Sequence, residues 1–147
     1  MKSILKHCAG AAGFTITELL LVMAIAGTVV ATAVPNLMSW LTGLRLSSAA
    51  RQIATDLQMA RMKAIAQNTN YTVAFSGNTY TYGTESRNLS TLYPGVTVTS
   101  VTSNPLFLPR GTANAAVTVT ISNGSAQQRV CVKTVGRVNI TTASVCS

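Results

Sequence analysis

The chain has 147 residues, enough for one ordinary domain with one additional segment, which argues against two independent domains. Hydrophobic residues make up 48% of it and charged residues only 10%, so part of the chain is not expected to face water. The formal net charge of +8 favours anionic partners such as phosphate backbones or lipid headgroups, and the three acidic residues leave little material for acid–base catalysis.

Residues 1–13 form a basic leader that carries Lys2 and Lys6 and ends in small residues. Phe14 then opens an apolar run to about Val34, in which Glu18 is the only charge. A helix of about 21 residues spans roughly 30 Å, the thickness of a bilayer core. We therefore expect residues 14–35 to cross a membrane, with the basic leader in the cytoplasm and the remainder exported.

An ordinary secretory signal is the alternative interpretation, with its cleavage site at Ala24-Ile25-Ala26 or Ala31-Thr32-Ala33. Glu18 argues against it, because a carboxylate inside an apolar helix is costly unless it is paired or protonated. A disposable signal would have no reason to carry such a residue. Glu18 therefore requires a partner.

The segment from Gly13 through Phe14 to Glu18, followed by the apolar run and Pro35, resembles the class III signal of type IV pilins and pseudopilins. That family combines a glycine before the cleavage site, a phenylalanine after it, an early glutamate and a later proline, and all four are in register here. The resemblance implies that a membrane prepilin peptidase cuts between Gly13 and Phe14. It also implies that the new amine of Phe14 is methylated and that the helix stays attached.

The resemblance gives Glu18 and Pro35 roles in assembly. Glu18 would neutralise the ammonium group of a neighbouring subunit's Phe14, and breaking such a buried pair by removing one partner costs about 3–5 kcal/mol. Pro35 would remove one helical hydrogen bond and kink or loosen the helix. A helix end at the membrane surface is the other interpretation of Pro35.

Residues 36–67 continue in helical period. Small and apolar side chains recur at three- and four-residue steps, at Leu46, Ala50, Ile53, Leu57, Ala60 and Ala64. The charged side chains lie mostly off this stripe, at Arg45, Arg51, Asp56, Arg61 and Lys63. We expect an amphipathic helix that packs on a sheet and is ended by the turn residues Asn68 to Asn70.

Residues 71–147 change to short β-rich runs separated by turn residues. The expected strands are Tyr71–Phe75, Thr79–Tyr82, Val96–Val101, Val117–Ile121, Arg129–Val135 and Arg137–Ile140. Asn123-Gly124 predicts a type I′ turn, and Tyr82–Pro94 is interpreted as a surface loop. The expected fold class is α+β, with a head of residues 36–147 in which one antiparallel sheet packs on the helix.

The head resembles the GspH/FimT group of minor pilins and pseudopilins over nearly its whole length. The similar segments are residues 44–50, 57–65, Leu106-Phe107 before Gly111, and 132–138. The resemblance implies a pilin-like fold and a low-abundance subunit that primes or caps a type IV pilus or a type II secretion pseudopilus. Its partners would be other pilins in a helical filament. It would be anchored in the bacterial inner membrane by a single pass, with the head in the periplasm.

The three cysteines divide into Cys8 in the leader and Cys131 with Cys146 near the C-terminus. In an oxidising compartment a Cys131–Cys146 bond would close a loop of about fifteen residues and stabilise the fold by about 3 kcal/mol. A reduced cytosolic pair is the alternative. We expect no metal site, because the only histidine, His7, lies outside the head.

Enzyme activity is not expected, because the head has no histidine and only Asp56 and Glu85 as carboxylates. No acid–base pair is evident from their wide separation. A thiol nucleophile at Cys131 would lack a histidine base, so a disulfide is the simpler interpretation. We likewise expect no cofactor.

DNA is a further partner that the resemblance implies, because some members of the group bind it through Gly-Arg-x-Arg. This chain has half of that motif, at Gly136-Arg137-Val138-Asn139. A basic edge that holds phosphates could comprise Arg129, Lys133 and Arg137, joined from loops by Arg87 and Arg110. The alternative is a solvated strand edge whose basic residues block unwanted pairing. Outside the pilin family, the alternative is a single-pass membrane protein with a β-rich periplasmic domain.

Overall fold

The computed structural model describes residues 14–146, without the side chains of residues 34–36. The chain divides into two compact units, Met1–Met38 and Ser39–Ser147, and one helix, α1 (Ile16–Gln67), contributes to both. The leader, with the predicted cleavage residue Gly13, lies outside the described residues.

Helix α1 has 52 residues and continues through Pro35, so the interpretation of Pro35 as a helix end is wrong. The helix ends where the sequence predicts. Asn68 adopts a left-handed backbone conformation with φ of 51°, and the N–H of Thr69 donates to the carbonyl of Ala64 at 3.2 Å. The N–H of Asn68 donates to the carbonyl of Ile65 at 3.3 Å, which completes a Schellman motif.

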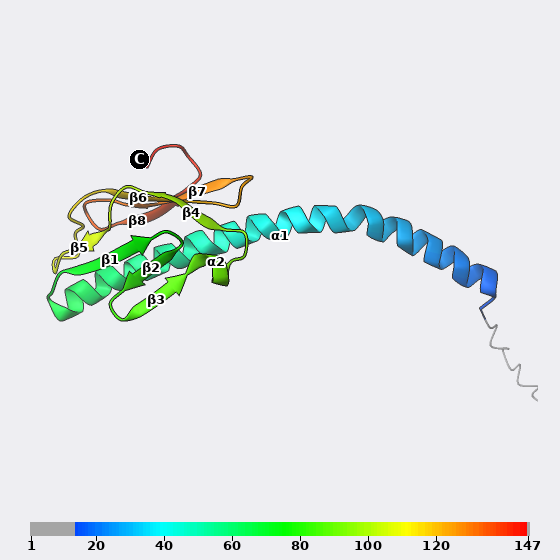
Figure 1. Cartoon of the computed structure of the whole chain (residues 1–147), viewed down its shortest axis with the longest axis horizontal. Helices are drawn as coiled ribbons and strands as arrows, with labels where there is room; N and C mark the ends of the chain where they lie inside the picture. The colour runs from blue at the N-terminus through cyan, green and yellow to red at the C-terminus, as the bar shows by residue number, and fades with distance from the viewer. Residues whose placement is uncertain (1–13, 147) are drawn as a thin grey trace, which may run out of the picture. The chain divides into compact units, whose positions relative to one another are not determined.

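The head contains two four-stranded antiparallel sheets instead of the single sheet expected (Figure 1). The first, in spatial order, consists of β3 (Glu85–Asn88), β2 (Thr79–Tyr82), β1 (Tyr71–Ser76) and β5 (Leu106–Phe107). The second consists of β4 (Thr97–Val101), β6 (Val117–Ser122), β7 (Gln127–Val132) and β8 (Val138–Thr141). The segment 82–94, expected to be a loop, contains β3 and a short helix, α2 (Leu89–Leu92).

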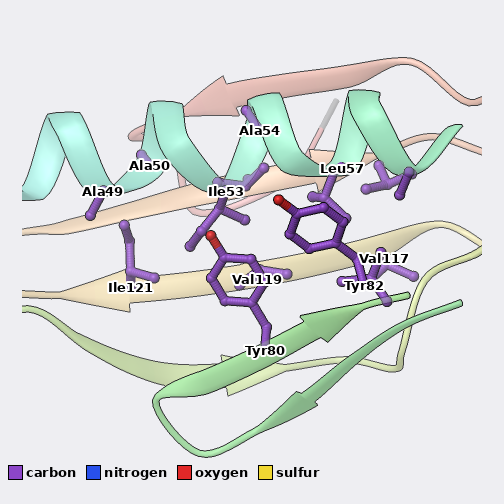
Figure 2. Close-up of a cluster of buried hydrophobic side chains, with 14 of the residues drawn as sticks. Ala49, Ala50, Ile53, Ala54, Leu57, Tyr80, Tyr82, Val117, Val119 and Ile121 are labelled. Carbon is purple, nitrogen blue, oxygen red and sulfur yellow. The ribbon is translucent and has the colours of Figure 1, made fainter. Parts of the chain in front are cut away.

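The core of the head lies between α1 and the two sheets. All of the predicted stripe residues on α1 are buried: Leu46, Ala50, Ile53, Leu57, Ala60 and Ala64. The alanines leave room for the aromatic rings of Tyr80 and Tyr82, which point from β2 toward the helix (Figure 2). Since burying one large apolar side chain stabilises a fold by about 1.5–3 kcal/mol, this stripe fixes which face of α1 carries the head.

Two turns of the second sheet differ from the expectation. Strand β7 ends at Val132, before the predicted Val135, because a turn follows in which the N–H of Gly136 donates to the carbonyl of Lys133 at 2.7 Å. The β6–β7 connection is a four-residue loop closed by the pair Ser122 and Gln127, so the type I′ prediction is wrong. Asn123 has no positive φ, which a type I′ turn would need, and its side-chain oxygen accepts from the N–H groups of the loop.

Candidate assembly helix and basic sheet face

The start of α1 is capped by Thr15, the residue immediately before it. Thr15 Oγ1 accepts a hydrogen bond from the backbone N–H of Glu18 at 3.3 Å, in the Thr-x-x-Glu spacing of a capping box. A carboxylate in the first turn also interacts favourably with the positive end of the helix dipole. Glu18 therefore also supports the helix locally.

The surface of α1 around Glu18 is apolar and exposed from residue 16 to residue 33. Within the described residues, α1 is the one helix long and apolar enough to cross a membrane, with a mean hydropathy of 2.0 over an 18-residue window. A signal sequence near an N-terminus meets the same criterion. Glu18 forms no ion pair with any described residue, and Phe14, four residues earlier, is 78% exposed. The helix thus presents a lone carboxylate on an uncovered apolar surface.

A buried carboxylate joins α1 to the first sheet. Asp56 is 1% exposed, and its Oδ2 accepts the hydroxyl hydrogen of Tyr80 at 2.5 Å and lies 3.3 Å from Nε of Arg87. The Gln52 amide, one turn earlier on α1, donates to both carboxylate oxygens at 3.1 and 3.2 Å. Burial, the hydrogen bond to Asp56 and the charge of Asp56 raise the pKa of Tyr80 far above its ordinary value.

Arg87 belongs to this cluster and not to the basic edge proposed from the sequence. Its Nε and NH2 atoms donate to the hydroxyl oxygen of Tyr82 at 3.2 Å, and its guanidinium lies 5.9 Å from the centre of that ring. The hydrogen bond with Tyr82 and the charge of Asp56 raise the pKa of Arg87, which keeps it protonated. Of the described residues, Arg87 and Asp56 form the one ion pair.

Sequence reasoning missed the cluster because it grouped Asp56 with the exposed charges of the helix. The signal was present in the spacing. Asp56 lies three residues after Ile53 and four before Ala60, so a helix of 3.6 residues per turn places it on the buried stripe. A lone acid on a buried stripe needs a partner, and the Tyr-rich β2 supplies one hydroxyl group.

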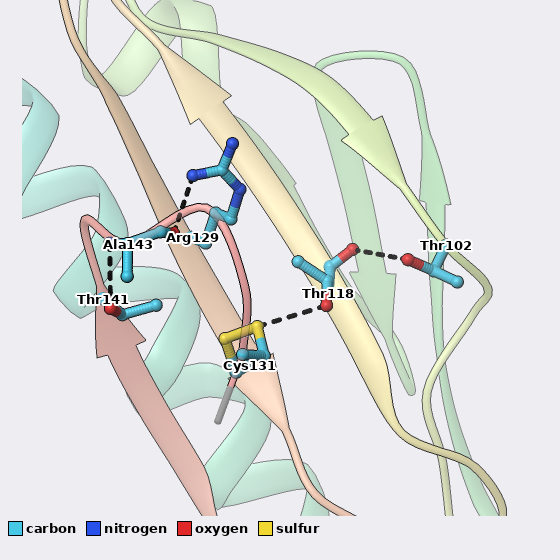
Figure 3. The surroundings of a disulfide bond; sticks show 7 residues. Thr102, Thr118, Arg129, Cys131, Thr141 and Ala143 are labelled. Atoms are coloured by element: carbon cyan, nitrogen blue, oxygen red, sulfur yellow. Dashed lines mark hydrogen bonds between the residues drawn. A yellow bond between two sulfur atoms is a disulfide. The ribbon is translucent and has the colours of Figure 1, made fainter.

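The predicted disulfide between Cys131 and Cys146 is present, with a Cα–Cα separation of 5.8 Å. It holds the C-terminal tail against the outer face of the second sheet (Figure 3). The tail makes two further contacts there: Sγ of Cys146 lies 3.2 Å from Thr118 Oγ1, and Arg129 NH1 donates to the carbonyl of Ala143 at 2.8 Å. The tail is therefore part of the folded head.

Arg129, Lys133 and Arg137 lie on this outer face of the second sheet. Arg129, Cys131 and Lys133 are alternate residues, and Lys133 is opposite Arg137, because its N–H donates to the Arg137 carbonyl at 2.8 Å. Like charges directly opposite each other destabilise an antiparallel pair. The carboxylates of the described head, Asp56 and Glu85, belong to α1 and β3, so neither neutralises this pair.

A loop contact brings Arg61 and Arg110 toward the turn between Lys133 and Arg137. The Nε of Arg61 donates to the carbonyl of Gly111 at 2.7 Å, and the Gly111 backbone packs directly against Gly136. Arg110 precedes Gly111 and is exposed. The arrangement gathers cationic side chains around one end of the head, where a polyanion or an acidic protein surface would be attracted.

Metal and catalytic chemistry have little support in the part of the chain that the structure describes. There, no three His, Cys, Asp or Glu side chains gather closely enough to hold a metal ion. Asp56 is saturated by its partners in the core, and Glu85 is on the surface in β3.

The comparisons with known proteins agree with this architecture. The family model of type II transport protein GspH matches residues 49–136, which is more than half of the chain. Two crystal structures of the type IV minor pilin FimU of Pseudomonas aeruginosa match with TM-scores of 0.55 and sequence identities of 18% and 19%. Each match covers 65% of this chain, and 92% or 87% of the FimU chain. No curated protein matches this chain at a significant level.

The FimU likeness concerns the fold alone, since identity is low. The GspH match extends from the buried stripe of α1 to the turn at Gly136, so it includes both sheets except β8. Together with the long apolar helix and the α+β head, it establishes the family: the chain belongs to the GspH family of type IV pilin-like proteins.

Proposed function

We propose that this chain is a minor pilin or pseudopilin subunit that assembles into, primes or caps a type IV pilus or a type II secretion pseudopilus. The observation that supports this most is Glu18, an exposed carboxylate without an ion-pair partner on the uncovered apolar surface of α1. Such a charge is costly in a bilayer and becomes favourable when a neighbouring ammonium group neutralises it. Family membership adds that the expected neighbours are other pilins.

Processing is part of the proposal. A prepilin peptidase in the bacterial inner membrane cuts between Gly13 and Phe14, and the amine of Phe14, which is then methylated, faces Glu18 of another subunit. The helix remains anchored by a single pass with the head in the periplasm, until the subunit enters the filament. Pro35 loosens α1 during that transfer by removing one helical hydrogen bond.

The test is Glu18→Ala in the native bacterium, with filament assembly and type II secretion as the readouts. We expect assembly to fall at least tenfold, while the chain still accumulates in the membrane. Thr17→Ala is the matched control, since it removes a neighbouring polar side chain and leaves the carboxylate. Unchanged assembly would favour an ordinary single-pass protein, in which removing Glu18 only eases insertion.

Mass spectrometry of the mature chain tests processing separately. We expect the chain to begin at methylated Phe14. A chain that begins after Ala26 or Ala33 would mean that an ordinary signal peptidase had removed most of the apolar run, and the pilin mechanism would then be lost.

DNA binding by the outer face of the second sheet is a second candidate function. The facing pair Lys133 and Arg137, with Arg129 on the same face and no acidic side chain among the described residues of that face, favours it. Phosphates would relieve the repulsion between the pair. The full chain in detergent should shift duplex DNA at low salt, and Arg137→Ala should weaken the shift more than Arg51→Ala, which removes an exposed charge from α1. No shift at low salt would remove this candidate.

A further inference from the structure

Strand β8 forms the free edge of the second sheet, and its register shows which main-chain groups point outward. The N–H of Lys133 donates to the carbonyl of Arg137, so these two residues form a hydrogen-bonded pair. Hydrogen-bonded and non-hydrogen-bonded pairs alternate in an antiparallel ladder, so Asn139 bonds to β7, whereas Val138 and Ile140 direct their N–H and C=O groups away from it. No described residue supplies a partner to these groups.

The other three sheet edges carry features that discourage strand pairing. Strand β3 has the charged residues Glu85 and Arg87, and β4 has a bulge between Val98 and Ser100. The N–H of Val98 is already bonded to the side-chain oxygen of Asn78 at 2.8 Å. Strand β5 has only two residues, with prolines shortly before and after it.

Strand β8 has none of these features. Its sequence is Val138-Asn139-Ile140-Thr141, without a charge, a proline or a bulge, and Ile140 is 41% exposed. The tail that follows turns across the outer face of the sheet to Cys131 (Figure 3). Its described residues make one hydrogen bond to β8, from the N–H of Ala143 to Thr141 Oγ1, and none to the main chain of Val138 or Ile140. An uncharged, β-branched edge of this kind is a ready template for another strand.

The positive charge of the head favours an acidic partner over a second copy of this chain. Residues 39–147 contain nine Lys and Arg against Asp56 and Glu85, so a second copy of this chain would meet repulsion. Arg137 immediately precedes β8 on the outer face and stands opposite Lys133. A strand paired with β8 would place an outward side chain beside Arg137, and a carboxylate at that position would relieve the repulsion between the two cations.

We propose that the free edge of β8 docks an extended strand of a different, acidic pilin-like subunit, with a carboxylate of that strand beside Arg137. The inference rests on the proposed function, since it names the surface through which this subunit contacts a neighbour's head. Main-chain hydrogen bonds to Val138 and Ile140 provide the affinity, and the carboxylate provides the selectivity.

The experiment uses full chains in detergent, with each of the other pilin-like subunits of the same machine added singly as the probe. Ile140→Pro removes an outward N–H and leaves the bonds to β7 in place, and Ile140→Thr is the matched control because it keeps the N–H and the β-branch. We expect Ile140→Pro to weaken binding of one subunit at least tenfold and Ile140→Thr less than threefold. If the two variants lose the same affinity, the Ile140 side chain and not its backbone N–H makes the contact with the partner. That result would overturn strand pairing.

Amide hydrogen exchange gives a second readout that needs no variant. On binding, the amides of Val138 and Ile140 should slow at least tenfold, while the amide of Asn139, already bonded to β7, changes little. The inference is overturned if no subunit binds, if the partner protects other residues only, or if protection arises when the chain is mixed with itself. If Ile140→Pro assembles normally while Glu18→Ala does not, the edge inference fails and the proposed function stands. Normal assembly of both variants refutes the function as well.

Discussion

Tyr80 donates its hydroxyl hydrogen to Oδ2 of Asp56 across 2.5 Å, inside the core and between β2 and α1. The two groups depend on each other, because a buried hydroxyl needs an acceptor and a buried carboxylate needs donors. Gln52 and Arg87 complete the carboxylate's partners from α1 and β3. A single acidic residue thus connects three elements of the head.

Replacing Asp56 with alanine should destabilise the head by about 3 kcal/mol, the lower end of the range for breaking a buried pair, because Arg87 is one-third exposed and can rehydrate. Tyr80 would retain a buried hydroxyl without its acceptor. Urea unfolding of the single variants Asp56→Ala and Tyr80→Phe and of the double variant measures the coupling. We expect a coupling of at least about 1 kcal/mol; additive effects would contradict the cluster.

Alkaline pH should destabilise the head through Tyr80. Burial and Asp56 raise the pKa of Tyr80, so above about pH 10 an unfolded chain loses a proton that the folded chain keeps. The unfolded state then binds fewer protons, and the free energy of unfolding falls as pH rises, by up to about 1.4 kcal/mol per pH unit, whereas below pH 10 this group has no effect. Urea unfolding from pH 9 to 11.5 should show a steeper decline for the native chain than for Tyr80→Phe. Parallel curves would refute the assignment.

Helical periodicity predicted the helix and its buried stripe correctly, because the 3.6-residue period follows directly from the positions of Leu46, Ile53 and Leu57. Local turn chemistry also placed the helix end at Asn68. The disulfide was predictable, since Cys131 and Cys146 are the two cysteines of the head.

The missed features depend on pairing between distant segments. Strand β3 contains Glu-Ser-Arg-Asn, which has no apolar alternation, and it becomes a strand because it pairs with β2. The division into two sheets depends on β1 pairing with β5 and β4 with β6, across segments that local patterns do not connect. Asn123, which departs from the type I′ turn, makes a contact of this kind, since its amide donates to the Thr42 carbonyl of α1 at 3.2 Å.

Gly136→Ala should destabilise the head more than Gly124→Ala. Both glycines have positive φ, 79° and 88°, so an alanine is strained by about 1–2 kcal/mol at either position. A Cβ at Gly136 would also collide with the Gly111 carbonyl and crowd Nε of Arg61, whereas nothing lies within 4 Å of a Cβ at Gly124. In thermal unfolding, we expect Gly136→Ala to lower the free energy of unfolding by at least about 1 kcal/mol more than Gly124→Ala does, because of the added clash. Equal effects would mean that the two loops do not press together.

Removing the disulfide tests whether the tail is part of the fold. Cys131→Ser with Cys146→Ser opens a link of sequence separation 15, and we expect a loss of about 3 kcal/mol in urea unfolding. Release of the tail should also free Arg129 from the Ala143 carbonyl and make residues 142–146 sensitive to protease. Thr118→Val is the control, since it removes only the contact with Cys146 and should cost less than about 1 kcal/mol. If the double serine variant unfolds like the native chain and its tail resists protease, hydrogen bonds alone hold the tail, and the disulfide contributes nothing to it.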